Sequence, residues 1–249
     1  MSKRIKKNRK IALITGSARR IGSSIVKDLH KDGIDVILHY NNSSEDANKI
    51  ALELNNERKD SCFPISFNLR NFNNYSKFYK DLGAWSNIDI LINNASTFYP
   101  TDIQNVDDEH WNDLIDVNLK APFFLSKLFY SDLKKNSGVI INIVDIYSDR
   151  ALKDFSIYSL SKSGLKMLTK SLAIEFGPHV RVNGVSPGSI LWPEVKEYEN
   201  EHKAIIDSTA LKRQGESQDI SSACLYLIKD ANYVTGQVIN VDGGRNLNF

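Results

Sequence analysis

Three residues have the types and spacing to perform acid–base chemistry. Tyr158 and Lys162 stand four residues apart in the run YSLSK, and Asp145 precedes the tyrosine by thirteen residues. Residues four apart share a helix face, so the Lys162 ammonium would lie near the Tyr158 phenol. A free phenol has a pKa of about 10, and a neighbouring positive charge lowers it. The pair therefore predicts a tyrosine acid–base group whose pKa is shifted toward working pH.

Asp145 narrows the kind of substrate that such a tyrosine could serve. An ionised carboxylate only accepts hydrogen bonds, so it opposes negative charge developing on a ketone oxygen. It suits a flat nitrogenous ring that has N–H donors or gains a proton on nitrogen. Phe98 would offer such a ring an apolar stacking face, and Arg20 would offer planar donors. Alternatively, Phe98 is loop packing and Asp145 pairs structurally with Arg150 or Lys162.

Short apolar runs alternate with amphipathic runs from residue 10 to the end of the chain. This alternation predicts a parallel sheet with helices on both faces. No linker rich in proline, glycine or serine divides the chain, so we expect one domain over residues 11–249. The predicted strands are Lys10–Thr15, Asp35–Tyr40, Cys62–Leu69, Ile88–Asn93, Gly138–Val144, Val180–Val185 and Gln237–Val241. The predicted helices are Ile21–Lys31, Ser44–Arg58, Asn71–Leu82, Asp107–Lys135, Phe155–Phe176 and Glu216–Lys229.

Local signals modify these elements at several positions. Pro122 should kink or interrupt the long helix Asp107–Lys135, because proline lacks the N–H that a helix interior requires. Ser44 is a candidate N-cap for the second helix. The segment Ser189–Leu211, which holds Trp192, breaks the alternation. It is either a lid over a site or a surface excursion.

The composition is that of an ordinary globular protein, at 41% hydrophobic and 25% charged residues, but the charge is uneven. Six basic side chains stand within residues 1–10; without them, 26 basic residues face 30 acidic ones, a formal charge of −4. The body has no basic surplus, so we expect no nucleic-acid partner. We expect residues 1–10 to form a basic, flexible arm; the alternative is contact with nucleic acid or an acidic membrane.

Cysteine usage and hydropathy indicate the compartment. Cys62 and Cys224 form neither a CxxC motif nor a metal-binding spacing, and both lie among apolar residues, as buried thiols in a reducing compartment do. No apolar run approaches the roughly 18 residues of a membrane span. The apolar run at residues 11–15 is too short for the core of a signal peptide. We therefore expect a cytoplasmic protein with no metal site and no membrane partner.

The turn Thr15–Gly22 follows the first predicted strand and opens the first helix, where open α/β sheets bind dinucleotides. Glycines permit close backbone approach, and the helix N-terminus attracts phosphate. Arg20 replaces the middle glycine of such turns. Residues 39–42 (HYNN) at the end of the second strand lack the carboxylate of an NAD site. With Arg19 and Arg20 nearby, this favours NADP, although Arg19 could simply be solvated.

Taken together, these motifs resemble the short-chain dehydrogenase/reductase family over essentially the whole chain after residue 10. The matching motifs, in family order and spacing, are Thr15–Gly22, Asn93-Asn94-Ala95, Asn118, Tyr158 with Lys162, and Pro187-Gly188. The resemblance implies an α/β, Rossmann-type doubly wound sheet of about seven parallel strands. It implies that Tyr158 donates a proton, Lys162 holds the nicotinamide ribose and Asn118 positions a water relay. It also implies a homotetramer, in which residues Asp242–Phe249 could pack across an interface.

A narrower set of residues is similar to the pteridine reductase group, including relatives of dihydromonapterin reductase. These are Arg20, His39-Tyr40, residues 95–100 (ASTFYP), Asp145 and residues 183–194. The resemblance implies NADPH-dependent reduction of a 7,8-dihydropterin or dihydrofolate to the tetrahydro form, and leaves activity on oxidised pterins open. The ring would lie between the nicotinamide and Phe98. The alternatives are a 3-oxoacyl thioester or other carbonyl reductase, and a non-catalytic NADP-binding regulator acting through the basic arm.

These resemblances imply a complete set of site residues. The catalytic residues would be Tyr158, Lys162, Asp145 and Asn118. NADPH would contact Gly16, Ser17, Arg19, Arg20, Ile21, Gly22, His39, Tyr40, Asn41, Asn68, Leu69, Asn94, Ala95, Ser96, Tyr158, Lys162, Pro187, Gly188 and Ile190. The pterin or folate substrate would contact Arg20, Ser96, Phe98, Asp145, Tyr158 and Trp192.

Overall fold

The computed structural model describes residues 9–190 and 199–247. The strands are β1 (Ile11–Ile14), β2 (Asp35–Tyr40), β3 (Cys62–Ser66), β4 (Ile90–Asn93), β5 (Val139–Ile143), β6 (Arg181–Pro187) and β7 (Val238–Val241). The helices are α1 (Arg20–Lys31), α2 (Ser44–Glu57), α3 (Tyr75–Leu82), α4 (Asp108–Ile115), α5 (Ala121–Lys135), α6 (Ser156–Phe176), α7 (Glu199–Ser208) and α8 (Ser217–Lys229). Most of the predicted basic arm and Trp192 lie outside the described residues.

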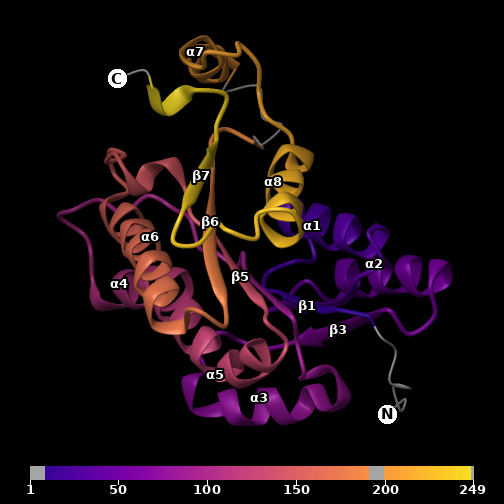
Figure 1. Cartoon of the computed structure of the whole chain (residues 1–249). Coiled ribbons are helices and arrows are strands. Elements are labelled where there is room, and N and C mark those ends of the chain that lie inside the picture. The colour runs from indigo at the N-terminus through magenta and orange to yellow at the C-terminus, as the bar shows by residue number, and fades with distance from the viewer. Residues whose placement is uncertain (1–8, 191–198, 248–249) are drawn as a thin grey trace.

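The strands form one seven-stranded sheet in the order β3-β2-β1-β4-β5-β6-β7 (Figure 1). Each neighbouring pair is parallel. The predicted doubly wound, Rossmann-type sheet is therefore confirmed. The strand order reverses between β1 and β4, and the crevice at such a reversal is where open α/β sheets bind ligands.

Two hydrophobic cores lie on opposite faces of the sheet. Helices α1, α2 and α8 pack on one face, and α3, α5 and α6 pack on the other (Figure 1). Alternate residues of β1 divide between the cores, because successive strand side chains point to opposite faces: Ala12 and Ile14 join the first, and Ile11 and Leu13 join the second. Burial on both faces accounts for the continuous apolar runs of the central strands.

The predicted helix Asp107–Lys135 is interrupted, but not at Pro122. A π-helix over Asp116–Lys120 separates α4 from α5. Pro122 lies in the first turn of α5, where proline's missing N–H costs little. The Asp107 side chain caps α4 by accepting a hydrogen bond from the backbone N–H of His110 at 2.9 Å.

Other element boundaries differ from the predictions by a few residues. Strand β3 ends at Ser66 instead of Leu69, and a 3₁₀ turn precedes α3. Ser43, not Ser44, is the N-cap residue of α2, and it makes no side-chain capping bond. The predicted irregular segment Ser189–Leu211 contains helix α7. In the described part of the chain, no helix combines the length and apolar character needed to cross a membrane.

The chain enters β1 through two basic residues. Arg9 makes an ion pair with the buried Asp35 at 3.7 Å, and the backbone N–H of Asp35 donates to Lys10 O at 2.9 Å. Arg58 pairs with the same carboxylate at 3.5 Å. The end of the predicted arm is therefore attached to the start of β2.

Candidate active site

The predicted site residues converge at the carboxyl edge of the sheet. Thr15 follows β1, Asn94 follows β4 and Asp145 follows β5, while Pro187 ends β6. Because parallel strands end at the same edge, these four segments meet at the edge where open α/β sheets bind ligands.

The two glycines of the turn after β1 stand where a side chain would not fit. A Cβ on Gly16, whose φ is +59°, would lie 2.8 Å from Ala95 Cα. A Cβ on Gly22 would lie 2.6 Å from Gly16 O. The turn opens directly into α1, where free N–H groups and the helix dipole favour an anion. These residues fit the phosphates of a dinucleotide.

Arg20 occupies this turn in a conformation that favours glycine. Its φ is +52°, and a left-handed arginine costs about 1 kcal/mol or more. The neighbouring Arg19, predicted to be available for a 2′-phosphate, donates from Nε to Asp46 Oδ2 at 2.5 Å. Asp46 stands in the first turn of α2. Arg19 therefore has an acidic partner, Asp46, that the prediction did not include.

Two side chains, those of His39 and Asn94, form hydrogen bonds with the backbone of the glycine turn. His39 is buried, and its Nδ1 accepts a hydrogen bond from the Gly16 N–H at 3.1 Å while Nε2 lies 2.9 Å from Phe67 O. Burial lowers the pKa of His39 to about 4, so the imidazole is neutral at physiological pH. Asn94 Nδ2 donates to Thr15 O and Gly16 O, both at 2.9 Å. Both residues therefore position the predicted phosphate turn.

Tyr158 and Lys162, both on α6, lie together with Asp145, which follows β5. The Tyr158 hydroxyl donates to Asp145 Oδ2 at 2.7 Å, and Asp145 Oδ1 accepts from the Tyr147 N–H at 2.9 Å. Lys162 is 2% exposed, and its Nζ donates to Ile143 O at 3.0 Å. That Nζ lies 5.7 Å from the centre of the Tyr158 ring. The predicted triad is thus one connected cluster.

The electrostatics of this cluster differ from the expectation. Burial and the Asp145 carboxylate both raise the pKa of Tyr158 well above its usual value. The expected shift of the Tyr158 pKa toward working pH is therefore wrong for the protein groups alone, because burial and the bonded carboxylate outweigh any lowering by Lys162. Burial lowers the pKa of Lys162 to about 8. Burial also raises the pKa of Asp145. The hydrogen bonds from Tyr147 and Tyr158, and the positive charges of Lys162 and Arg245, act in the lowering direction.

Asn118 lies within the π-helix Asp116–Lys120 and is fully buried. Its Nδ2 donates to Thr97 O at 3.0 Å and to Ser161 Oγ at 3.1 Å, and its Oδ1 accepts from the Thr97 N–H at 2.9 Å. It therefore joins the loop after β4 to helix α6. A π turn at a functional position is common, and the water relay through Asn118 stays a prediction.

Phe98 lies beside Tyr158, with its ring edge-on at 4.7 Å between centroids. One face of Phe98 stacks on Phe155 at 4.6 Å, a neighbour that the prediction missed. The Phe98 side chain is 55% exposed. A stacking ligand would therefore use its remaining face. Ser96 is near enough to Tyr158 to act on its pKa in the lowering direction.

The remaining residues that were predicted to contact the cofactor differ in their burial and in their hydrogen bonds. Asn68 Oδ1 accepts from the Arg70 N–H at 2.9 Å, so one of its lone pairs is used within the protein. The Gly188 N–H donates to Val241 O at 3.0 Å, and Ile190 is buried. Leu69 is buried and Tyr40 is half-buried, while Asn41 and Ser96 are exposed.

Three residues that the prediction missed lie next to the cluster. Arg245 donates from Nη1 to Ser189 Oγ at 2.5 Å and from Nη2 to Tyr147 Oη at 3.1 Å. Tyr147 is two residues beyond Asp145, and Ser189 follows Pro187-Gly188. The position of Arg245 directly after Asp242-Gly243-Gly244 was the available signal, but the sequence alone does not show where the tail folds.

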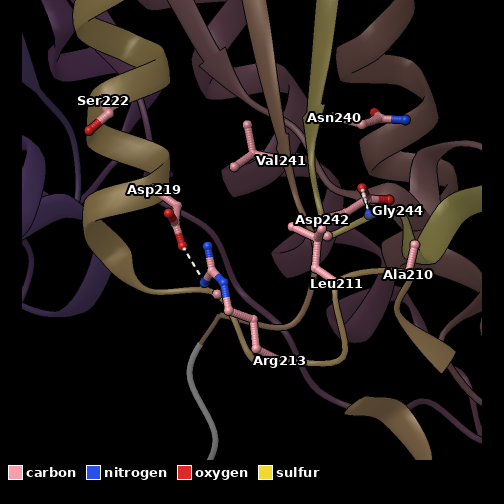
Figure 2. A pocket seen from close by; sticks show the side chains of 11 residues that line it. Ala210, Leu211, Arg213, Asp219, Ser222, Asn240, Val241, Asp242 and Gly244 are labelled. Atoms are coloured by element: carbon pink, nitrogen blue, oxygen red, sulfur yellow. Dashed lines mark hydrogen bonds and ion pairs between the residues drawn. The ribbon is translucent and has the colours of Figure 1, made fainter. Parts of the chain in front are cut away.

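A separate cavity of about 480 Å³ lies between α8, β7 and residues 210–215 (Figure 2). Arg213 and Asp219 pair across its rim at 3.2 Å. None of the predicted catalytic residues lines this cavity. It borders Gly243 and Gly244, the residues just before Arg245.

Comparisons with known proteins agree with this geometry. The family model described as enoyl-(acyl carrier protein) reductase matches residues 16–246. Pteridine reductase 1 of Leishmania tarentolae is 31% identical over 278 residues, covering 95% of this chain and 96% of that protein. A 3-oxoacyl-(acyl-carrier-protein) reductase FabG of Staphylococcus epidermidis is 32% identical over 240 residues, covering 94% and 98%. A FabG of Buchnera aphidicola is 34% identical over 242 residues, covering 95% and 97%.

Pteridine reductase and FabG are thus similarly distant from this chain, at 31–34% identity. The family model extends from Gly16 past Tyr158 to residue 246, and each of these three relatives covers 94–95% of this chain. The chain therefore belongs to the short-chain dehydrogenase/reductase family and is an NAD(P)-dependent oxidoreductase.

Proposed function

We propose that the protein is an NADPH-dependent pteridine reductase. The observation that carries this proposal is the 2.7 Å hydrogen bond from the Tyr158 hydroxyl to the half-buried Asp145 carboxylate. A carboxylate beside the reacting tyrosine accepts hydrogen bonds from a substrate and repels an oxyanion. That polarity suits a 7,8-dihydropterin, whose ring offers N–H groups and gains a proton on nitrogen.

The reaction needs one hydride and one proton for the C=N bond of the ring. When bound, reduced nicotinamide supplies the hydride to the carbon. The proton reaches the adjacent nitrogen from Tyr158 Oη, directly or through a water ordered by Asp145. As the N–H bond forms, the O–H bond of Tyr158 breaks. Lys162, with a pKa of about 8, exchanges protons near neutral pH and restores the phenol.

Phe98, which contacts two other aromatic side chains, supports the binding of a flat ring. Phe98 is stacked on Phe155 and edge-on to Tyr158, which holds its ring in place. Its free face offers a stacking surface, worth roughly 0.5–1.5 kcal/mol beyond burial. Ser96 and Arg20 bind the polar edge of the ring in this proposal.

The preference for NADPH rests on charge at the end of β2. Arg19 and Arg20 lie within the glycine turn, and residues 39–42 contain no acid. Asp46 pairs with Arg19 and neutralises part of this positive charge. A 2′-phosphate with a charge near −2 would compete with Asp46 for the guanidinium.

A second candidate is reduction of a 3-oxoacyl thioester. The relatives named FabG, at 32–34% identity, favour it, and the Asp145 carboxylate beside Tyr158 disfavours it. The two functions are separated by measuring NADPH oxidation with dihydrobiopterin, dihydrofolate and an acetoacetyl thioester in parallel. Turnover of the dihydropterins supports the proposal, and turnover of the thioester alone contradicts it.

We also propose that the protein forms a homotetramer. Large apolar side chains are exposed on three helices of one face, among them Trp111 of α4, Phe123 of α5, and Met167 and Ile174 of α6. Such a surface is typical of an interface. Light scattering should give four times the 28.2 kDa mass of one chain, and a monomer would contradict the proposal.

A further inference from the structure

Arg245 follows β7, the last strand of the sheet, and lies near the cluster of Tyr158, Asp145 and Lys162. Its guanidinium bridges Ser189 Oγ at 2.5 Å and Tyr147 Oη at 3.1 Å, and it lies 5.8 Å from the centre of the Tyr147 ring. Ser189 extends the loop after β6, and Tyr147 extends the loop after β5. The arginine therefore spans the two loops that flank Asp145 and Tyr158.

The backbone that carries Arg245 is fixed by its own hydrogen bonds. The Asp242 carboxylate accepts from the Gly244 N–H at 2.9 Å and from the Asn246 N–H at 2.7 Å. A Cβ on Gly188 would lie 2.6 Å from Asp242 Cα, so the tail packs tightly against the loop after β6. With both backbone and guanidinium held, Arg245 is ordered before a ligand arrives.

Arg245 makes no direct ion pair with a described side chain, although its charge acts on Asp145 at longer range and lowers the pKa of that carboxyl. Both of its hydrogen-bond partners are neutral hydroxyls. Among the side chains that the structure describes, those of residues 9–190 and 203–247, no ion pair includes Arg245, whereas Arg19 pairs with Asp46 and Arg213 pairs with Asp219. Asp242 uses its carboxylate on backbone N–H groups. A half-buried guanidinium with free N–H donors at the edge of a site is suited to an anionic oxygen group.

We propose that Arg245 is a specificity residue that binds an anionic group, a carboxylate or a phosphate, on the substituent extending from the reacting ring of the substrate. The inference rests on the proposed function and narrows it to dihydropterins with an acidic side chain. A hydrogen bond to a charged partner is worth about 1.5–3 kcal/mol. Loss of the guanidinium should therefore weaken recognition of such a substrate by roughly 10- to 100-fold.

The test compares three substrates that share one ring: dihydrobiopterin with a neutral side chain, dihydrofolate with carboxylates, and dihydroneopterin monophosphate with a phosphate. In Arg245→Gln, kcat/KM should fall by roughly 10- to 100-fold for at least one anionic substrate, mainly through KM. It should fall less than about 3-fold for dihydrobiopterin, and Arg245→Lys should restore part of the loss. Arg213→Gln is the matched control, because that arginine is already paired, and it should leave all three substrates unchanged.

An equal loss for neutral and anionic substrates would overturn the inference, since it would show that Arg245 acts on Asp145 or on folding. A measurement on the unaltered protein guards against a misfolded variant. Added salt should raise KM for the preferred anionic substrate and leave KM for dihydrobiopterin unchanged, because screening weakens only the charged contact; no difference would also overturn the inference. Failure to reduce any of the three dihydropterins would instead contradict the proposed function, and this inference with it.

Discussion

The Tyr158 hydroxyl donates a 2.7 Å hydrogen bond to Oδ2 of Asp145. The carboxylate is oriented by a second bond from the Tyr147 N–H at 2.9 Å. Burial of the phenol, together with its hydrogen bond to this carboxylate, raises the pKa of Tyr158. A site with this polarity favours a substrate that brings N–H donors over one that brings a carbonyl oxygen alone.

Replacement of Asp145 by serine should lower turnover of a dihydropterin by about 100-fold, the size of one acid–base contribution. The dissociation constant of NADPH should change less than about 3-fold, because the carboxylate lies on the substrate side of the crevice in this proposal. Steady-state kinetics and fluorescence titration of NADPH measure the two quantities. Asp149→Ser is the matched control, since Asp149 lies on the same loop but pairs with Lys166. Equal loss of turnover and NADPH binding would show that Asp145 is structural.

The pH profile of kcat/KM should be bell-shaped. The acid side reports Asp145, whose pKa burial raises above that of an ordinary aspartate, so activity is lost as pH falls through that raised value. The basic side reports Lys162, whose ammonium is lost as pH rises through about 8. In Lys162→Arg, residual activity should keep the acid limb and lose the basic limb, because arginine stays charged. An unmoved basic limb would assign it to another group.

Arg20 should cost stability and support binding. Its φ of +52° favours glycine, so Arg20→Gly should stabilise the fold by about 0.5–1 kcal/mol. The same change should lower kcat/KM for NADPH by about 10-fold, because donors to phosphate and substrate are lost. Asp60→Gly is the control, since Asp60 has φ +53° in an exposed turn. It should leave kinetics unchanged; an equal kinetic loss there would remove the functional role of Arg20.

The ratio of NADPH to NADH use should depend on Arg19. Arg19→Ala should raise KM for NADPH by about 5- to 10-fold and leave KM for NADH nearly unchanged, since only NADPH carries the 2′-phosphate. Asp46→Asn should have the opposite sign, because it releases the guanidinium from its 2.5 Å contact. If both variants changed the two cofactors in parallel, Arg19 would be a structural residue.

Much of the fold was predictable because its signals are local. Short apolar runs separated by amphipathic ones determined the strands, and β2 has the predicted bounds Asp35–Tyr40. The helix interruption was predicted at Pro122, but Pro122 fits in the first turn of α5. The interruption is instead the π-helix Asp116–Lys120, which contains the buried Asn118.

The site was predictable where spacing and motif order carry it, as for Tyr158 and Lys162. Contacts between distant segments were not predictable. His39 supports Gly16 from beneath the turn, Phe155 covers one face of Phe98, and Arg245 joins two loops far from it in sequence. The direction of the Tyr158 pKa also escaped prediction, because it depends on burial and on a direct bond to Asp145.

A crystal structure of the protein with NADP and a dihydropterin tests the central claim most directly. We predict that the ring lies against the free face of Phe98, with a ring nitrogen within hydrogen-bond distance of Asp145 or of a water bound to it. A ring bound elsewhere, or one with no contact to Asp145 and Tyr158, would contradict the account.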